Sequence, residues 1–582
     1  MGTAGDRTGY KVFSINTTIR NPARNYDFLK VFERFNGIEN TDTNLYLYYF
    51  DLIKNGIYKS IKVPNSIKVK WDNNLELSSS EVKTIIDNNP QAPGLKGRVM
   101  TQLRALKDQS LLFFEDTDKR SIKKIFISKL GKELLQHPEN AQTIYTKIML
   151  SMHAKNPCRT TMMNESIPFL NTLFTIREVN RIWKDLGNEP KGILMHEFGA
   201  FVLSMTDCNY KQTARDIINY RNKFKFEINQ NYIEEYLKNK NILPFTFESI
   251  KRDYPDEVYR KFEMTGLITR HGKFNYVYIN FSNYNIEKVN TILNDYNNYF
   301  FQEFNTQKEY FEFQEQTYIP WENNDIIRRQ IVEAKAKALS VSLDPYKSLD
   351  EKENYLDTLF YNSALAKAVD KIELKSIYRE LLILSGTCKE KSKYESISEP
   401  LRLEYLLALL LGKLYGTKGL VSNIIYNEEG LPLHCAVGGK CDISYHDVNG
   451  SYILEPTMQT GKNQQLNSET TNIVRHSKQE ESKTGISYRV LMVAPRIHAD
   501  VIDFFKYKIA TDNAKILSLS IDETVDLFNM SPSILKLNNQ YDIEMHILAS
   551  SSNQEYADEV NSFRFDLKDV GVSKIHQTEA TN

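Results

Sequence analysis

A continuous apolar run near the C-terminus constrains the fold more than any other feature of the chain. Residues 488–495 read YRVLMVAP, a pattern typical of a strand that is buried on both faces of a sheet. The run is followed by a helical pattern over residues 498–509, a β-rich run over 514–521 and a second helical pattern over 522–530. This alternation predicts an α/β domain in the C-terminal part of the chain.

Two short β-runs, residues 442–446 (DISYH) and 451–457 (SYILEPT), precede that strand. The Asn449–Gly450 pair between them is a strong signal for a hairpin turn. Strand alternation and a tight turn can bring Asp442 and Glu455 side by side. Two neighbouring carboxylates repel each other unless a cation lies between them, and an oxygen-only site with open positions suits Mg²⁺. The hairpin therefore predicts a magnesium site.

Helical patterns on either side of the hairpin carry further acidic residues. Residues 399–416 are apolar nearly all round, which predicts a buried helix. Glu404 within it is costly to bury unless it is paired, and Arg402 is available as a purely structural partner. After the hairpin, residues 466–482 form a predicted helix with Glu469 in its first turn and His476 further along.

The N-terminal half contains a basic helix followed by a β-hairpin. The helix LKGRVMTQLRALK buries a stripe of apolar residues, and we expect Arg98, Thr101 and Gln102 to lie on its opposite face. Two β-runs at about 111–114 and 123–128 follow, so the order of elements is that of a winged helix, with this helix in the major groove. Arg98 suits guanine and Gln102 suits adenine.

Local charge supports a DNA-binding role for this unit. Residues 94–132 contain ten Lys and Arg against four Asp and Glu, a net charge of +6. A basic wing of Lys119, Arg120, Lys123 and Lys124 suits phosphate contacts. The alternative is a solvated helix face with a charged hairpin turn. The sequence contains a second helix-plus-hairpin pattern, in which Gly272 lies in the turn. Two such units together support DNA binding more strongly than either unit does alone.

Composition excludes several classes of protein. The chain has 582 residues, 41% of them hydrophobic and 25% charged, which is ordinary for a globular protein of about three to five domains. No apolar run is long enough to span a membrane, and we expect no membrane partner. Lys and Arg number 74, as do Asp and Glu, so any basic surface is local. Five scattered cysteines fit a reducing cytoplasm, and the C-x5-C spacing of Cys435 and Cys441 matches no usual structural zinc pattern.

The predicted fold class is therefore multidomain α/β. We expect a mostly helical DNA-recognition half over residues 1–315, with winged-helix-like units at about 78–136 and 245–283 and a helical unit at about 163–225. A helical linker over 316–345 follows, and residues 346–582 form an α/β nuclease-like domain. The buried helix, the acidic hairpin and the alternating elements have the order of the PD-(D/E)xK restriction-endonuclease core.

The chain resembles the AlwI-type restriction endonucleases, which include site-specific nicking enzymes and their double-strand-cutting relatives. The resemblance is densest from RLEYLLALLLGKLYG through LPLHCAVGGKCDI and YILEPTMQTGKNQQ to ETTNIVRH and VLMVAPRI. It implies that Glu404, Asp442, Glu455 and Glu469 are the catalytic residues, with Asp442 and Glu455 as metal ligands. Thr457 stands where the generic motif has lysine, and Lys462 and His476 are nearby auxiliary candidates.

The function implied by the resemblance is that of a bacterial, cytoplasmic type IIS restriction endonuclease. Such an enzyme binds a short asymmetric sequence in double-stranded DNA and cleaves at a fixed distance outside it, with Mg²⁺ as cofactor. Since one chain supplies one acidic cluster, double-strand cleavage would need transient self-association or a separate second subunit. The alternative is a non-catalytic winged-helix regulator with a degenerate nuclease-like domain.

Overall fold

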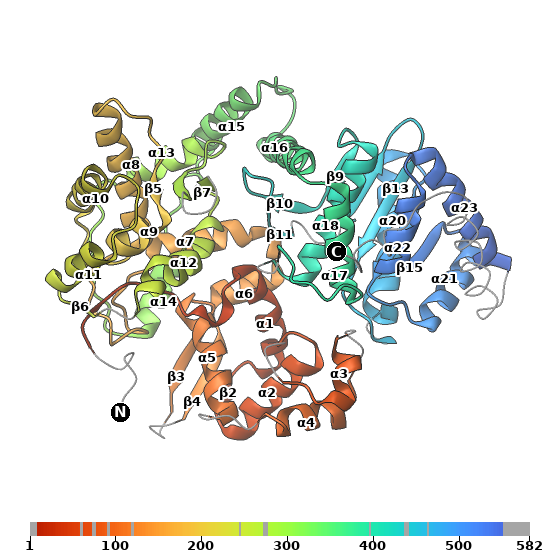
Figure 1. The fold of residues 1–582 in the computed structure, drawn as a ribbon, viewed down its shortest axis with the longest axis horizontal. Coiled ribbons are helices and arrows are strands. Elements are labelled where there is room, and N and C mark those ends of the chain that lie inside the picture. Colours follow the sequence, from red (N-terminus) through yellow and green to blue (C-terminus); the bar gives the residue numbers. More distant parts are fainter. Residues whose placement is uncertain are drawn as a thin grey trace, which may run out of the picture. The chain divides into compact units, whose positions relative to one another are not determined.

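The computed structural model describes residues 8–58, 62–72, 77–89, 94–117, 122–243, 246–271, 277–394, 397–435, 441–462 and 465–550. The chain divides into two compact units. Unit 1 consists of Met1–Ile57 and Pro90–Phe360, and unit 2 consists of Tyr58–Asn89 and Tyr361–Asn582 (Figure 1). Both units combine helices with sheets, so the predicted mixed α/β class is confirmed.

The first helix–sheet assembly of unit 1 contains the basic helix predicted from the sequence. This helix is α5 (Gly94–Asp108), and the hairpin after it consists of β3 (Leu112–Asp116) and β4 (Lys123–Ile127). A third strand, β2 (Ile38–Glu39), pairs with β4, and α5 packs on α2 (Asp42–Lys54). The helix and the hairpin are confirmed. The assembly also draws on residues upstream of position 78, where the sequence pattern placed its start.

The second helix–sheet assembly has the same arrangement of strands. Its sheet has the order β5-β8-β7, from β5 (Ile193–Leu194), β7 (Ile268–His271) and β8 (Tyr278–Phe281). Helix α12 (Tyr254–Glu263) precedes the hairpin and packs on β7. The predicted hairpin is confirmed, whereas Gly272 lies outside the described residues.

Helix α12 is largely buried, and the N-terminal segment of the chain supplies hydrogen-bond partners to it. Glu257 and Lys261 form an ion pair on α12 whose side chains are fully buried. Glu257 Oε2 accepts a hydrogen bond from the backbone N–H of Ile15 at 3.0 Å, and Lys261 Nζ donates to the carbonyl of Ile19 at 3.3 Å. Backbone groups of the segment thus satisfy a buried ion pair that would otherwise be destabilising.

The remaining elements of unit 1 are mostly helical. Within residues 163–225, where the sequence predicts a helical unit, α8 (Pro168–Asp185) and α10 (Tyr210–Phe224) pack against each other. Strands β1 (Tyr10–Lys11) and β6 (Ile242–Leu243) pair in parallel. The other helices are α1 (Asn25–Phe32), α6 (Lys129–Gln136), α7 (Ala141–Ser151), α8 (Pro168–Asp185), α9 (Met195–Glu197), α10 (Tyr210–Phe224), α11 (Gln230–Asn239), α13 (Ile286–Asp295), α14 (Gln307–Glu315) and α15 (Asp325–Leu339).

Unit 2 is built on a five-stranded mixed sheet with the order β15-β14-β13-β12-β9. Its strands are β9 (Leu420–Ser422), β12 (Ile443–His446), β13 (Ser451–Pro456), β14 (Arg489–Ala494) and β15 (Ile516–Ser520). Strands β13, β14 and β15 are parallel, whereas β12 is antiparallel to both of its neighbours. Strand β14 is the apolar run of the sequence, and its position between β13 and β15 confirms the prediction of a buried strand.

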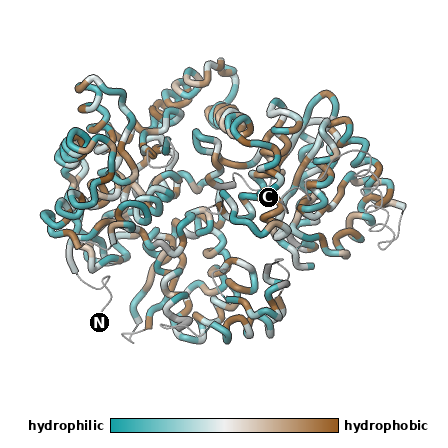
Figure 2. The backbone as a smooth tube through the Cα atoms, in the orientation of Figure 1, coloured by the Kyte–Doolittle hydropathy of each residue, from teal (hydrophilic) through white to brown (hydrophobic). Residues whose placement is uncertain are grey.

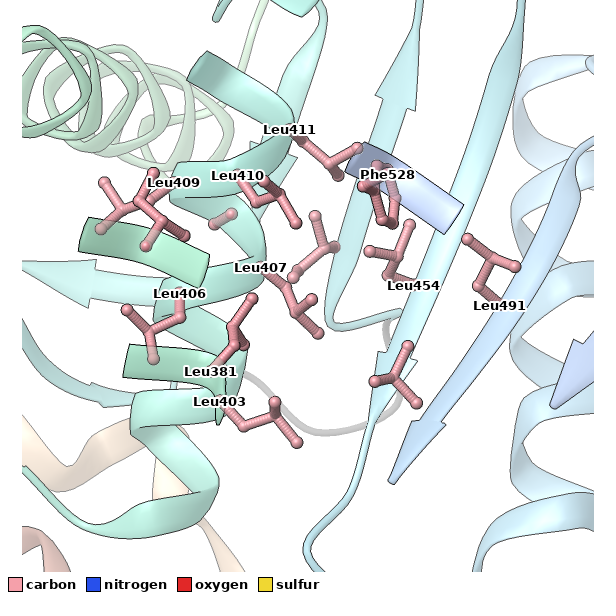
Figure 3. Packing of buried hydrophobic residues seen from close by; sticks show 14 of the residues in the cluster. Leu381, Leu403, Leu406, Leu407, Leu409, Leu410, Leu411, Leu454, Leu491 and Phe528 are labelled. Carbon is pink, nitrogen blue, oxygen red and sulfur yellow. The ribbon is translucent and has the colours of Figure 1, made fainter. Parts of the chain in front are cut away.

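Helices cover both faces of this sheet. One face packs against α18 (Glu399–Tyr415) and α22 (Ile521–Met530), while the other packs against α20 (Thr471–Thr484) and α21 (Ala499–Asp512). In Figure 3, leucines of α18 lie between Leu381 of α17 (Leu374–Ser385) and the strands that carry Leu454 and Leu491. Since both faces are covered, polar side chains at the strand ends are the ones left for chemistry.

Unit 2 also contains short elements outside the main sheet. Strands β10 (Ile424–Tyr426) and β11 (Pro432–Cys435) form a separate antiparallel pair. Helices α3 (Asn65–Asp72), α4 (Ser79–Asp87) and α23 (Ile534–Ser550) complete the unit, and α16 (Leu349–Lys371) runs across the division at Phe360. A serine caps the N-terminus of α4. The cap is Ser78, because Glu81 three residues later completes a capping box with it.

Most helices of the fold mix hydrophilic and hydrophobic residues along their length (Figure 2). Within the part of the chain that the structure describes, no helix is both long and apolar enough to cross a membrane. This finding agrees with the absence of a long apolar run in the sequence.

Candidate active site

The hairpin of unit 2 places two carboxylates on adjacent strands. Strands β12 and β13 pair with Ile443 opposite Leu454, and continuing this register by one residue sets Asp442 opposite Glu455. The turn is held by the Asp447 carboxylate, which accepts hydrogen bonds from the backbone N–H groups of Asn449 and Gly450. This register confirms the predicted hairpin and its turn.

Helix α20 and the π-helical turn before it (Gln465–Thr470) bring two further candidates to the same strand end. His476 Nδ1 lies 3.2 Å from Glu455 Oε1. The Nε2 atom of His476 is buried, with no hydrogen-bond partner among the described residues. The Thr457 hydroxyl donates a hydrogen bond to the Glu469 carboxylate. His476 and Glu469 thus lie beside the hairpin carboxylates.

The pKa values show that the four acidic residues form one electrostatic cluster. Burial raises the pKa of Asp442 well above its usual value, and the charges of Glu404, Glu455 and Glu469 raise it further. Burial also raises the pKa of Glu455, although His476 opposes the shift. Burial and the charge of Glu455 raise the pKa of Glu469 to about 7. The carboxylates of this site retain protons because their negative charges repel one another. A bound cation would relieve the same repulsion.

Glu404 reaches this cluster from the opposite side of the sheet. It lies in α18, which packs on the face that carries Ile443 and Leu454. Its side chain is buried, with 8% of the residue exposed, and its charge acts on Asp442. The structure therefore brings together all four acidic residues that were singled out from the sequence.

Lys462, the other auxiliary candidate, forms an ion pair outside the acidic cluster. Its ammonium group forms an ion pair with Asp500 at the start of α21, and its side chain is half exposed. Thr457, at the position of the generic lysine, is buried, and its backbone N–H donates to the Val493 carbonyl at 2.8 Å. The structure thus leaves His476 as the auxiliary candidate in direct contact with the cluster.

Gln465 shapes the segment between β13 and α20, and no sequence pattern identified it. Its buried side-chain amide donates to the backbone carbonyls of Gln459 and Arg496, both at 2.8 Å. Its Oε1 accepts from the backbone N–H of His498 at 3.0 Å. Gln465 therefore ties the segment that follows Glu455 to the segment that follows β14. A polar residue in an irregular segment carries no signal of burial, so this role became visible only in the structure.

Two carboxylates of the cluster, Asp442 and Glu455, are the candidate ligands of a divalent metal ion. Among the described residues, no three His, Cys, Asp or Glu side chains form a group that could hold a metal ion by themselves. Mg²⁺ commonly takes one or two carboxylates and keeps several waters. Asp442 and Glu455, opposite each other on adjacent strands, match that requirement.

The candidate DNA-contacting residues of α5 need one correction. Arg98 and Thr101 are partly exposed, but Gln102 is 1% exposed, so its predicted position on the open face is wrong. Gln102 lies three residues after Val99 and four before Leu106, both fully buried, which keeps it on the buried side of the helix. Arg104, which was not singled out from the sequence, is exposed.

The wing residues are only partly described. Lys119 and Arg120 lie outside the described residues. Lys123 forms an ion pair with Asp116 at 2.5 Å, while Lys124 is exposed on β4 opposite Glu115. The wing therefore offers Lys124 to an anionic partner directly, whereas Lys123 would have to exchange a carboxylate for a phosphate.

The sequence profile of the AlwI restriction endonuclease family matches residues 115–526, more than two thirds of the chain. The chain belongs to this family. AlwI-family membership makes the protein a restriction endonuclease, that is, a type II site-specific deoxyribonuclease. It confirms the resemblance found in the sequence and decides for the enzyme against the non-catalytic regulator. The matched range contains Glu404, Asp442, Glu455 and Glu469, whereas α5 lies before it.

Two solved structures are similar to parts of this AlwI-family chain. One is the small subunit of the heterodimeric restriction endonuclease R.BspD6I, with 20% identity and a TM-score of 0.27, covering 33% of this chain and 97% of that one. The other is the restriction endonuclease FokI, with 12% identity and a TM-score of 0.19, covering 88% of this chain and 70% of that one. The comparison with curated proteins gave no match.

Proposed function

We propose that this endonuclease binds a short asymmetric DNA sequence through unit 1 and hydrolyses a phosphodiester at a fixed distance outside that sequence. The acidic cluster of unit 2 is the proposed cleavage site, and the reaction depends on Mg²⁺. The observation that carries the proposal is the placement of Asp442 opposite Glu455, with Glu404 and Glu469 close enough to raise the pKa of Asp442. Such repulsion is relieved when a cation binds.

Each residue of the cluster has a separate role in this proposal. Asp442 and Glu455 would hold the ion, which supplies positive charge against the negative charge that builds up on the phosphoryl oxygens. His476 orients the Glu455 carboxylate through its Nδ1 atom. Glu469 and Glu404 would orient the two ligands without binding the ion themselves. Glu469 is hydrogen-bonded to Thr457, and Glu404 lies in α18. Thr457 offers a hydroxyl where a lysine would offer an ammonium group.

The order of elements in unit 2 supports a PD-(D/E)xK-like catalytic domain. The buried helix α18 is followed by the β12–β13 hairpin, by α20 and by the parallel strands β14 and β15, with α21 between them. This is the order that the sequence predicted for the nuclease core. The two acidic residues belong to the paired strands of the hairpin, and these strands hold the proposed ligands in fixed positions.

The strand arrangement of unit 1 supports two winged-helix DNA-binding subdomains. In each assembly the first strand in the chain pairs with the third, and the third pairs with the second, giving β2-β4-β3 and β5-β8-β7. In the first assembly, α5 precedes the hairpin and presents Arg98, Thr101 and Arg104 on its outer side. We propose that α5 reads bases and that Lys123 and Lys124 contact phosphates, while Gln102 has no contact with DNA.

Cleavage of supercoiled plasmid DNA in the presence of Mg²⁺ tests the function. The wild-type protein should give a nicked circle or discrete fragments, and chelation of the metal should stop the reaction. Asp442→Ala should lower the rate by about three or more powers of ten while specific binding remains, because the reading half lies elsewhere. Glu481→Ala, an exposed position on α20, is the matched control and should cut normally. Full activity of Asp442→Ala would refute the metal site.

A further inference from the structure

Helix α16 is the only described helix that belongs to both units. It runs without interruption from Leu349 to Lys371, and the division between the units falls within it, after Phe360. Its later part is buried in the core of unit 2, where Ala364, Leu365 and Val369 pack with leucines of α18. A single α-helix rises about 1.5 Å per residue and transmits position along its length. Its earlier part is attached to unit 1 by side chains of α15 and of the segment before α13.

Asp357 is the centre of that attachment. The hydroxyl of Tyr284 donates to Asp357 Oδ1 at 2.5 Å, and the ammonium group of Lys335 donates to the same oxygen at 2.8 Å. Burial alone would raise the pKa of Asp357, but the charges of Lys335 and Lys288 and these two hydrogen bonds hold it below its usual value. The carboxylate is thus ionised and receives donors from α15 and from the segment before α13.

Aromatic contacts complete the joint. The rings of Tyr284 and Phe360 stack at a centroid distance of 3.9 Å with an interplanar angle of 7°. Lys335 Nζ lies 4.4 Å from the centre of the Tyr284 ring, and Lys335 is 3% exposed. Tyr284 therefore contacts α15 and α16 at the same time. We define the joint as Tyr284, Lys335, Asp357 and Phe360.

The apolar packing around the joint is small. The core cluster between α15 and α16 consists of Val332, Ala336 and Leu356, with a few partly buried neighbours. This packing joins the two helices to each other, whereas Tyr284 joins the pair to the segment that leads into α13. A small apolar cluster leaves directional contacts to fix the angle of α16. These contacts are the hydrogen-bonded Asp357 carboxylate, the ring stack and the ion pairs of Arg328 in α15 with Asp350 and Glu353 in α16.

We propose that the joint is a positioning device that sets the distance between the recognised sequence and the phosphodiester that is cut. The inference rests on the proposed function, because it assigns recognition to unit 1 and cleavage to unit 2. The joint fixes the first half of α16 on unit 1, and the second half is part of the core of unit 2. Loosening the joint should therefore broaden the choice of phosphodiester and leave both recognition and the acidic cluster intact.

Mapping of the cut ends at single-nucleotide resolution on a duplex with one recognition site tests the inference. Two variants loosen the joint to different degrees. Asp357→Asn removes the charge that faces the buried Lys335, and Tyr284→Phe removes one hydrogen bond but keeps the ring stack. Asp370→Asn, an exposed position on the same helix, is the matched control. Thermal unfolding and duplex affinity are measured for every variant.

The wild type and Asp370→Asn should give one main position. In Asp357→Asn the share of ends at that position should fall about twofold or more, with new ends at adjacent phosphodiesters, because small displacements redistribute reaction rates. Tyr284→Phe should show the same change to a smaller degree, which keeps the test valid if Asp357→Asn does not fold. Unchanged ends in both folded variants would overturn the inference. Scattered ends or no cutting in the wild type would instead refute the proposed function.

Discussion

At the scale of single residues, the acidic cluster should make the metal-free protein lose stability as pH rises. Binding of Mg²⁺ should offset this loss. The raised pKa of Glu469, about 7, and that of Asp442 mean that the folded, metal-free protein holds protons that the unfolded chain releases near pH 4. A carboxyl group with a raised pKa in the folded state stabilises the fold at low pH. That contribution falls as pH rises above the unfolded pKa and is lost once pH passes the folded value.

We therefore expect Mg²⁺ to raise the melting temperature of the wild-type protein more at pH 8 than at pH 6. At pH 8 the ion finds ionised carboxylates, and at ten times its dissociation constant it would add about 1.4 kcal/mol to the free energy of unfolding. At pH 6 the gain is smaller, because the carboxyl groups must first release protons before they bind the ion. Differential scanning calorimetry with and without Mg²⁺ measures the effect.

Two variants separate this effect from general ion binding. Asp442→Asn should lose the Mg²⁺-dependent shift at both pH values, whereas Glu481→Gln, exposed on α20, should keep it. An equal shift at pH 6 and pH 8, or a full shift in Asp442→Asn, would show that the ion binds elsewhere on the protein.

At the scale of elements, local patterns predicted the hairpins and helices well. The Asn449–Gly450 turn and the alternation around it were enough to find β12 and β13, because both signals lie within a few residues of each other. The sequence could not reveal β2, a two-residue strand that pairs with β4 across more than eighty positions. It could not reveal that α5 packs on α2 either, because that contact depends on tertiary packing.

The same limit explains the partial success at the candidate site. The spacing in the hairpin and the family resemblance identified the four acidic residues and His476. The hydrogen bonds of Gln465 join segments that are separated by more than thirty residues in the chain, and no local pattern signals such a contact. Residues in irregular segments that act through backbone groups therefore remain the hardest to find from one sequence.

The orientation of α5 about its own axis determines which of its residues could reach DNA. Gln102 is buried and its Oε1 has no hydrogen-bond partner among the residues that the structure describes, whereas Arg104, two residues later on the opposite side of the helix, is exposed. Gln102→Ala should lower the free energy of unfolding by about 1–3 kcal/mol and leave base preference unchanged. Arg104→Ala should leave stability unchanged and weaken specific DNA binding by about 1–3 kcal/mol. Urea unfolding and duplex titration measure the two effects, and a reversal of the pattern would mean that α5 presents its other side to DNA.

At the scale of the whole molecule, the chain has unlike halves and a single Asp442–Glu455 pair. The two helix–sheet assemblies of unit 1 differ in the exposure of the helix before the hairpin, because α12 is largely buried whereas α5 presents the exposed Arg104. A reading half with unlike parts in series suits a non-palindromic site that is bound in one orientation. One acidic pair can act on one phosphodiester at a time.

We therefore expect a single copy of the protein to nick one defined strand first, at a fixed offset from the site. A second cut would need the acidic cluster of another copy, or of a separate subunit, and such association depends on concentration. A time course on supercoiled plasmid should show nicked circles accumulating before linear DNA. If the second subunit is another copy, the linear fraction should rise with enzyme concentration and with two sites per plasmid. Asp442→Ala added in excess should then block the second cut by occupying the partner's place with an inactive cluster. Direct conversion of supercoiled to linear DNA at sub-stoichiometric enzyme, independent of concentration, would exclude this mechanism, because a single acidic pair would then have cut both strands in one binding event.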